Sequence, residues 1–233
     1  VGSEMCIRDR RKKREFLRQR FFQQINRVRM ENLRSRISPH FTFNVLGREI
    51  NQFNGSEEVK HNLMELVKYL RRSLELTEKL SVSLQDELDF VRTYIELERG
   101  RVGEDFVATI TVEDGLDATR IMIPSMIVQI PVENAIKHGL AGKDGKKELM
   151  VYVSRETNGI RITVTDNGRG YLPQVVSATR GTGTGLKVLY QTIQLLNTKN
   201  KSDKIRFNIT NRSDGQTGTE VSVYIPFRFS YDL

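Results

Sequence analysis

Apolar residues between Arg11 and Ile95 recur mostly at spacings of three and four, which is the period of an amphipathic helix. One helix is predicted from Arg11 to Phe53, a second begins at Ser56, and a third begins at Ser83, because serine hydroxyls favour the first turn of a helix. The apolar faces of the last two helices consist of Val59, Leu63, Leu66, Val67, Leu70 and Leu74, and of Leu84, Leu88, Val91 and Ile95. A lone helical hairpin cannot bury both stripes, so we expect these helices to dimerise.

Beyond residue 103 the pattern changes to short alternating runs that are typical of strands, separated by turns and two further helices. The predicted elements are the strand Phe106–Val112, a helix over 125–138, a hairpin of 149–153 with 160–164 around Asn158 and Gly159, a helix over 184–196, and strands over 205–210 and 219–225. Strands and helices mixed without strict alternation predict an α+β fold, in which a two-layer α/β sandwich follows the helical hairpin.

Charge changes this picture only at the N-terminus. Residues 1–36 hold 12 Lys or Arg and 4 Asp or Glu, and the remaining residues hold 25 of each sign, so the net charge of +8 belongs to one arm. No recognition helix accompanies the arm, and we expect no direct nucleic-acid binding. A basic helix beside a membrane span and an ordinary solvated helix face both remain open.

The N-terminal ten residues show no clear period and do not begin with Met, and we expect them to be non-native sequence. Cys6 is the only cysteine, which excludes an intramolecular disulfide. No apolar stretch approaches the roughly 20 residues that a membrane helix needs. We therefore expect the C-terminal part of a longer protein.

A candidate nucleophile, His40, lies directly after Pro39 in the first predicted helix. An imidazole with an ordinary pKa of about 6.5 is mostly neutral, and therefore nucleophilic, at neutral pH. Phe41, Phe43 and Leu46 can anchor the opposite helix face, which would leave the ring exposed. The alternative is a hydrogen-bonded structural histidine.

A second candidate site lies on the helix predicted over 125–138. The carboxamide oxygen of Asn134 suits Mg²⁺, which typically bridges few protein groups to substrate phosphates. Lys137 and His138, three and four residues further on, share its face and could meet phosphate oxygens. The alternative is the polar edge of an amphipathic helix.

The segment Asp166-Asn167-Gly168-Arg169-Gly170 directly follows a predicted strand. A carboxylate there can accept a hydrogen bond from the adenine amino group, and the glycines let the backbone approach a flat base. An ordinary turn would have the same composition.

Gly181, Gly183 and Gly185 alternate ahead of the helix that begins near Thr184. Free backbone N–H groups at such a helix start suit phosphate oxygens. The Gly-Lys-Ser/Thr sequence of the common phosphate loop is absent, and a flexible linker is the alternative.

The segment from Arg36 to Asn44 resembles the hallmark of LytS/YehU-like sensor histidine kinases with a GHKL (Bergerat-fold) ATPase domain. That hallmark reads roughly Gln-Ile-Asn-Pro-His-Phe-Leu-Phe-Asn, and the chain keeps its Pro, His, both Phe and Asn. The resemblance covers about residues 33–228 and implies a basic juxtamembrane signalling helix over 11–32, a dimerisation and phosphoacceptor domain over 33–102, and an ATP-binding domain over 103–229.

The resemblance also implies functional roles. His40 would be the phosphoacceptor, Asn134 the Mg²⁺ ligand, and Glu133 an acid/base or metal-shell residue. The remaining ATP contacts would come from Lys137, His138, Asp166, Asn167, Gly168, Gly170, Gly181, Gly183, Thr184 and Gly185. The phosphoryl group would pass from Mg²⁺-bound ATP to His40, and then to an aspartate of a response regulator, often one with a LytTR DNA-binding domain. The homodimer would lie on the cytoplasmic side of the bacterial inner membrane, below a missing membrane sensor.

Three alternatives share the ATP domain. A GHKL ATPase of the gyrase or Hsp90 kind needs a water-activating acid four residues before Asn134, where this chain has Ile130. A serine kinase of the anti-sigma type would lack the helix with His40. A catalytically weak pseudokinase that acts as a dimeric scaffold stays open, and ATP binding without phosphohistidine would favour it.

Overall fold

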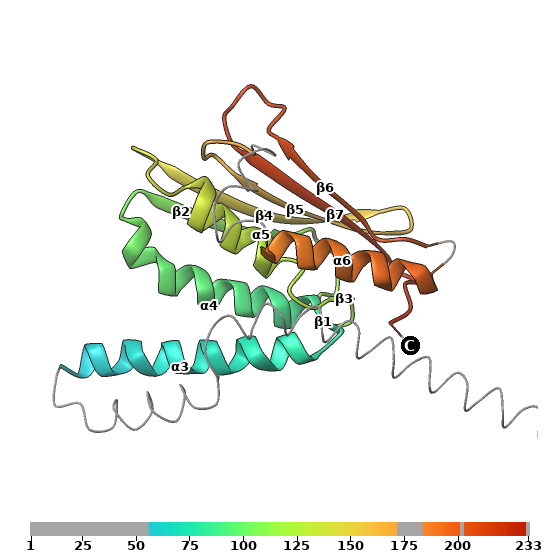
Figure 1. Cartoon of the computed structure of the whole chain (residues 1–233), viewed down its shortest axis with the longest axis horizontal. Coiled ribbons are helices and arrows are strands. Elements are labelled where there is room, and N and C mark those ends of the chain that lie inside the picture. Colours follow the sequence, from blue (N-terminus) through green and yellow to red (C-terminus); the bar gives the residue numbers. More distant parts are fainter. Residues whose placement is uncertain (1–55, 172–183, 201–202, 232–233) are drawn as a thin grey trace, which may run out of the picture.

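The computed structural model describes residues 56–171, 184–200 and 203–231 (Figure 1). The helix predicted from Arg11 to Phe53, with His40, lies outside these residues, as do Cys6, Gly181 and Gly183. In chain order the elements are α3 (Glu57–Glu78), β1 (Ser81–Ser83), α4 (Leu84–Val102), β2 (Phe106–Val112), β3 (Met122–Pro124), α5 (Gln129–Asn134), the π-helix η1 (Ala135–Gly139), β4 (Lys147–Glu156), β5 (Gly159–Asp166), α6 (Thr184–Lys199), β6 (Arg206–Asn211) and β7 (Thr219–Pro226).

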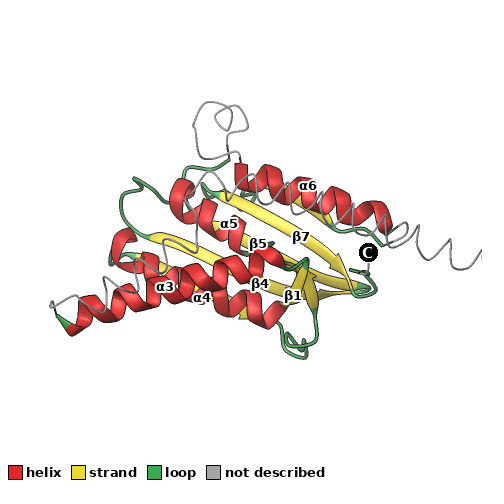
Figure 2. Ribbon diagram, turned by 60° about the horizontal axis from the view of Figure 1, so that its bottom comes forward, coloured by secondary structure: helices red, strands yellow, loops and turns green. Residues whose placement is uncertain are grey.

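Helices α3 and α4 lie side by side and begin where the sequence predicts (Figures 1 and 2). The hydroxyl of Ser56 accepts a hydrogen bond from the Val59 N–H at 3.4 Å, and the hydroxyl of Ser83 accepts from the Asp86 N–H at 3.0 Å. Both N-caps are therefore confirmed. Of the part of the chain that the structure describes, no helix is long and apolar enough to cross a bilayer.

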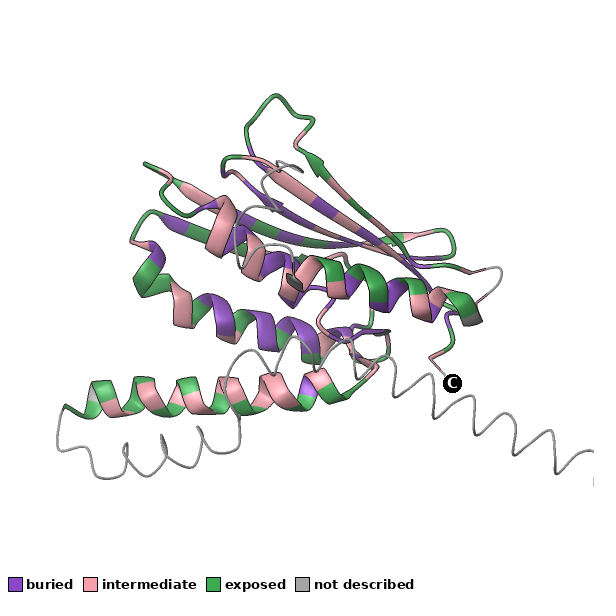
Figure 3. Cartoon of the chain, in the orientation of Figure 1, coloured by how far each residue is buried: buried purple, intermediate pink, exposed green. Residues whose placement is uncertain are grey.

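The two helices differ in how far they are buried (Figure 3). The predicted apolar face of α4 is buried in the same core as the sheet, whereas Val59, Met64 and Leu66 of α3 are exposed. A groove of about 850 Å³ lies between the helices, with Leu63 and Leu97 in its lining. The stripe on α3 is thus only partly covered by the described residues.

The sheet has the order β2-β4-β5-β7-β6, in which β2 is parallel to β4 and every other neighbouring pair is antiparallel. Helices α4, α5 and α6 lie on one face (Figure 2). Along β4, Val151 and Val153 are buried toward the helices, whereas Met150 and Tyr152 on the opposite face are 46% and 38% exposed. This alternation is that of a sheet covered on one side only, and the predicted two-layer sandwich is confirmed.

The helix predicted over 125–138 is wrong at its start. Residues 125–128 form turns, α5 begins at Gln129, and η1 continues it to Gly139. Met126 has a φ of 69°, which an α-helix does not admit, and Pro131 lacks an N–H group and is tolerated in the first helical turn. The two-stranded sheet of β1 and β3 was not predicted, since three residues are too few to show a period.

The hairpin of β4 and β5 is confirmed, but its turn lies one residue earlier than expected. Glu156 pairs with Gly159, so Thr157 and Asn158 form the turn and Gly159 already belongs to β5. A Cβ atom on Gly159 would lie 2.3 Å from the carbonyl oxygen of Ile225 on β7. This glycine is therefore required by close backbone approach within the sheet rather than by the turn.

Candidate nucleotide-binding site

Helix α5 presents Glu133 and Asn134 at its C-terminal end. The Asn134 side-chain amide donates to the carbonyl oxygen of Ile130 at 2.8 Å, and none of the described residues donates to its Oδ1. The described residues contain no cluster of three or more His, Cys, Asp or Glu that could enclose a metal ion. A single carboxamide oxygen suits Mg²⁺, which keeps most of its shell from water and phosphate, so the residues fit this ion.

Both carboxylate oxygens of Glu133 are engaged. Oε1 accepts from the Gln129 side-chain amide at 3.1 Å, and Oε2 accepts from the Lys137 ammonium at 2.9 Å. The same ammonium lies 5.8 Å from the ring centroid of Tyr94. Lys137, predicted to contact phosphate, is thus held by Glu133 in this structure.

His138 and Arg169 join the end of η1 to the turn after β5. The His138 carbonyl oxygen accepts from the Arg169 guanidinium at 2.9 Å. Burial lowers the pKa of the His138 ring, and the positive charges of Lys137 and Arg169 lower it further. A lowered pKa favours the neutral form of this ring.

Asp166 ends β5 and is buried, with 4% of its surface exposed. Its Oδ1 accepts from the Gly168 N–H at 2.7 Å and from the Thr219 N–H at 3.4 Å. Burial raises the pKa of the carboxyl group, and these two N–H donors oppose the rise. A carboxylate this deeply placed is available only to a group that approaches the turn closely.

Close backbone contacts join η1 to the Asp166 turn. A Cβ on Gly139 would lie 2.9 Å from the Asp166 carboxyl carbon, and a Cβ on Gly168 would lie 2.1 Å from the Gly139 carbonyl oxygen. The Arg169 N–H also donates to that carbonyl oxygen at 3.2 Å. The structure thus brings together the two segments that carry Asn134 and Asp166.

Two further glycines, one in the turn and one directly before β7, are also crowded by their neighbours. Gly170 has a φ of 85°, and a Cβ there would lie 2.7 Å from the Asn211 side-chain oxygen. Gly218 has a φ of 140°, and a Cβ there would lie 1.9 Å from the Asp166 carbonyl oxygen. Gly218 was not predicted as a site residue, because its only signal in the sequence is a glycine directly before a predicted strand.

Asn167 has a different surrounding from its neighbours. Its side-chain oxygen accepts from the Glu148 N–H at 2.8 Å, and its side-chain amide donates to the Lys146 carbonyl oxygen at 3.0 Å. Both contacts are to the start of β4. The Asn167 side chain therefore ties the turn to the neighbouring strand.

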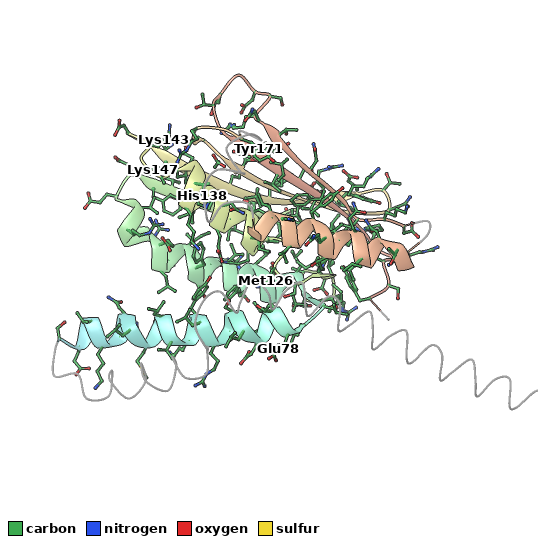
Figure 4. The ribbon with its side chains drawn as sticks, viewed as in Figure 1. Glu78, Met126, His138, Lys143, Lys147 and Tyr171 are labelled. Carbon is green, nitrogen blue, oxygen red and sulfur yellow. The ribbon has the colours of Figure 1, made fainter. Side chains whose placement is uncertain are left out.

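A cavity of about 350 Å³ opens beside these contacts. Lys143 and Arg169 supply its cationic side chains, and Figure 4 shows Lys143 and His138 toward the upper left of the view, with Tyr171 nearer its middle. Its lining is otherwise made of small and polar residues: Gly139, Ala141, Gly142, Gly168 and Thr217. A cationic cavity with exposed backbone suits an anionic ligand that carries a flat group.

The start of α6 approaches the same region. Thr184 is its first residue, and a Cβ on Gly185 would lie 3.4 Å from the side chain of Ile130 on α5. Of the three alternating glycines, Gly185 is the one within the described residues. The residue that it approaches, Ile130, lies one turn of α5 before Asn134. The start of α6 therefore packs against the helix that carries Asn134.

Two family models match this chain. The histidine kinase family model matches residues 28–106, and the model of the histidine kinase-, DNA gyrase B-, and HSP90-like ATPases matches residues 119–228. The sensor histidine kinase YpdA of Escherichia coli is 28% identical over 202 residues, which cover 86% of this chain and 34% of YpdA. The sensor histidine kinase/phosphatase LytS of Staphylococcus aureus is 32% identical over 197 residues, which cover 81% of this chain and 33% of LytS. The chain thus spans about a third of the length of these relatives.

Among solved structures, the histidine kinase domain of the blue-light activated histidine kinase of Erythrobacter litoralis aligns with a TM-score of 0.48 and 16% identity. The alignment covers 88% of this chain and 94% of that chain.

Proposed function

Because this chain belongs to the histidine kinases of the LytS/YehU type and carries their ATP-binding domain, we propose that it phosphorylates its own His40 from Mg²⁺-bound ATP. It then passes the phosphoryl group to an aspartate of a response regulator. The observation that carries this proposal is the direct contact of the Gly139 and Gly168 backbones, which joins the helical segment that follows Asn134 to the turn that follows Asp166, beside one cavity.

In this proposal Asp166 accepts a hydrogen bond from the adenine amino group, and Gly168 and Gly170 allow the base to approach. Asn134 holds Mg²⁺, which neutralises phosphate charge when it is bound. Lys143 and Arg169 attract the phosphates through the charge of the cavity. Gly181, Gly183, Thr184 and Gly185 supply N–H groups to the phosphate oxygens at the start of α6.

Phosphoryl transfer requires a neutral imidazole. A lone pair on a His40 ring nitrogen forms the bond to the γ-phosphorus while the bond to the bridging oxygen breaks, and ADP leaves. The proton on the other ring nitrogen goes to a base. Glu133, held by Gln129 and Lys137, is the carboxylate that we assign to this step.

The partners follow from the same proposal. The exposed apolar residues Val59, Met64 and Leu66 on α3 support a homodimer formed through helices. The response regulator is one with an acceptor aspartate, in this family often joined to a LytTR domain. In the intact protein this region lies on the cytoplasmic side of the bacterial inner membrane and responds to a membrane sensor.

The test is autophosphorylation with γ-labelled ATP and Mg²⁺, comparing the wild-type chain with His40→Gln and Asn134→Ala. The matched controls are His61→Gln and Asn158→Ala, which change exposed residues of the same types. We expect acid-labile, base-stable label in the wild type and both controls, and none in the two site variants. Label that survives His40→Gln would assign the phosphoacceptor elsewhere. ATP binding without any label would favour the pseudokinase scaffold.

A further inference from the structure

A fully buried side chain connects α3 to Glu133. The side-chain amide of Gln129, on α5, donates both to the Tyr69 hydroxyl oxygen at 3.1 Å and to Glu133 Oε1 at 3.1 Å. Tyr69 lies on α3, sixty residues earlier in the chain. Gln129 therefore bridges the helical hairpin and the carboxylate that follows it by one turn of α5.

The Tyr69 hydroxyl has a fixed position. Its ring stacks on Phe90 with centroids 4.8 Å apart and planes 3° from parallel, and it packs on Tyr94 at 5.7 Å. Burial raises the pKa of the Tyr69 hydroxyl, and the nearby charge of Glu133 raises it further, so the group stays protonated. Because α3 and α4 hold this ring, the hydroxyl follows the hairpin rather than moving independently.

The network that Gln129 completes is only partly satisfied. Among the described residues, Gln129 Oε1 and the Tyr94 hydroxyl are the buried side-chain polar atoms that have no hydrogen-bond partner. Buried unpaired polar atoms lower stability, and a buried apolar residue at position 129 would avoid that cost. Stability of the fold alone does not explain a glutamine here, whereas two hydrogen bonds directed at Tyr69 and Glu133 do.

We propose that Gln129 is a positioning residue, which holds Glu133 for phosphoryl transfer, and that Tyr69 makes this orientation depend on the placement of α3. The inference rests on the proposed kinase function. A displacement of α3 from α5 withdraws the Tyr69 oxygen, the Gln129 amide then turns, and Glu133 loses one of its two donors. Because α3 directly follows the segment that contains His40, a signal that moves the hairpin reaches Glu133 by this route.

The test compares single-turnover autophosphorylation by Tyr69→Phe, Gln129→Met and the double variant. Tyr69→Phe keeps the ring stack, Gln129→Met keeps the side-chain length, and Tyr152→Phe on the open face of the sheet is the matched control. We expect kcat to fall about tenfold in Gln129→Met and about threefold in Tyr69→Phe, with the KM for ATP and the melting temperature nearly unchanged. The double variant should equal Gln129→Met, because Tyr69 acts through Gln129.

Four outcomes would overturn the inference. They are a kcat unchanged in both single variants, additive losses in the double variant, equal losses in kcat and ATP affinity, and a loss that tracks the melting temperature alone. The last two would describe a purely structural pair. The wild-type chain distinguishes a failure of this inference from a failure of the proposed function. If the wild type forms no phosphohistidine, the kinase assignment fails. If the wild type is phosphorylated and the variants are unaffected, only the inference is contradicted.

Discussion

Helix α5 takes its N-terminal cap from another helix. Its own N-cap residue, Val128, has no side-chain hydrogen bond to offer. Glu87 on α4 is fully buried instead, and its carboxylate accepts from the N–H groups of Met126 at 2.8 Å, Val128 at 2.9 Å and Gln129 at 3.2 Å. We predict that this carboxylate is one of the most important single groups for the stability of the chain.

The magnitude follows from the three donors. A hydrogen bond to a charged group contributes about 1.5–3 kcal/mol, and a buried donor left unpaired costs about 1–3 kcal/mol. Glu87→Gln keeps one acceptor oxygen but turns an amide group toward an N–H donor, so it should lower the free energy of unfolding by about 2–3 kcal/mol. Glu87→Ala removes all three acceptor contacts and leaves a cavity, and should cost about 4–5 kcal/mol.

Urea denaturation followed by circular dichroism measures both values, at one protein concentration so that association is held constant. Glu96→Gln is the matched control, since Glu96 lies on the same helix but pairs with Arg99 at the surface. It should have far less effect than Glu87→Gln. Equal unfolding free energies for the two Gln variants would refute the assignment of Glu87 as the cap of α5.

Two further predictions concern the Asp166 turn. Asp166→Asn removes the carboxylate that accepts from the adenine amino group in the proposed function, so titration calorimetry should show ATP binding weakened at least about tenfold. Because the asparagine keeps an oxygen that can accept from the Gly168 N–H, the melting temperature at pH 7 should not fall. Since burial raises the folded-state pKa of Asp166 above its ordinary 3.8, ionisation lowers stability as the pH rises through that window. The variant should melt above the wild type at pH 7, and a gap that persists below about pH 4 would contradict this cause. Gly168→Ala places a Cβ 2.1 Å from the Gly139 carbonyl oxygen and should cost at least about 2 kcal/mol in urea denaturation, whereas Gly100→Ala, with no atom within 4 Å, should not destabilise.

Local patterns predicted most elements, because the signals for them lie within the elements themselves. The alternation in Phe106–Val112 predicted β2 with the observed bounds, and Ser56 and Ser83 marked two helix starts. The start of α5 could not be predicted in this way. It depends on the left-handed backbone of Met126 and on a cap that arrives from α4, and neither leaves a local trace.

In the site, too, some features could be predicted from local sequence and others depend on tertiary contacts. Asp166 and Asn134 could be selected by residue type and by resemblance, but the contact between Gly139 and Gly168 exists only after β5 and η1 have packed. In the sequence alone, Glu87 is an acid in the first turn of α4, a position that favours the helix through its dipole. The carboxylate of its neighbour Asp86 accepts a hydrogen bond from the Ser83 hydroxyl at the surface, whereas the Glu87 carboxylate points inward to α5. Two adjacent acids thus differ in burial and in hydrogen-bond partners, and this difference arises only from tertiary packing.

The crowded backbone around Asp166 also bears on inhibitor resistance. At Gly139, Gly168 and Gly218 any side chain would collide with neighbouring carboxyl or carbonyl atoms, so substitution there disrupts the fold before it can reshape a binding surface. A compound that gains its affinity from these backbone atoms therefore meets a surface from which the protein has few routes of mutational escape. Compounds that depend on the Lys143 or Arg169 side chains, at the rim of the same cavity, have no such protection.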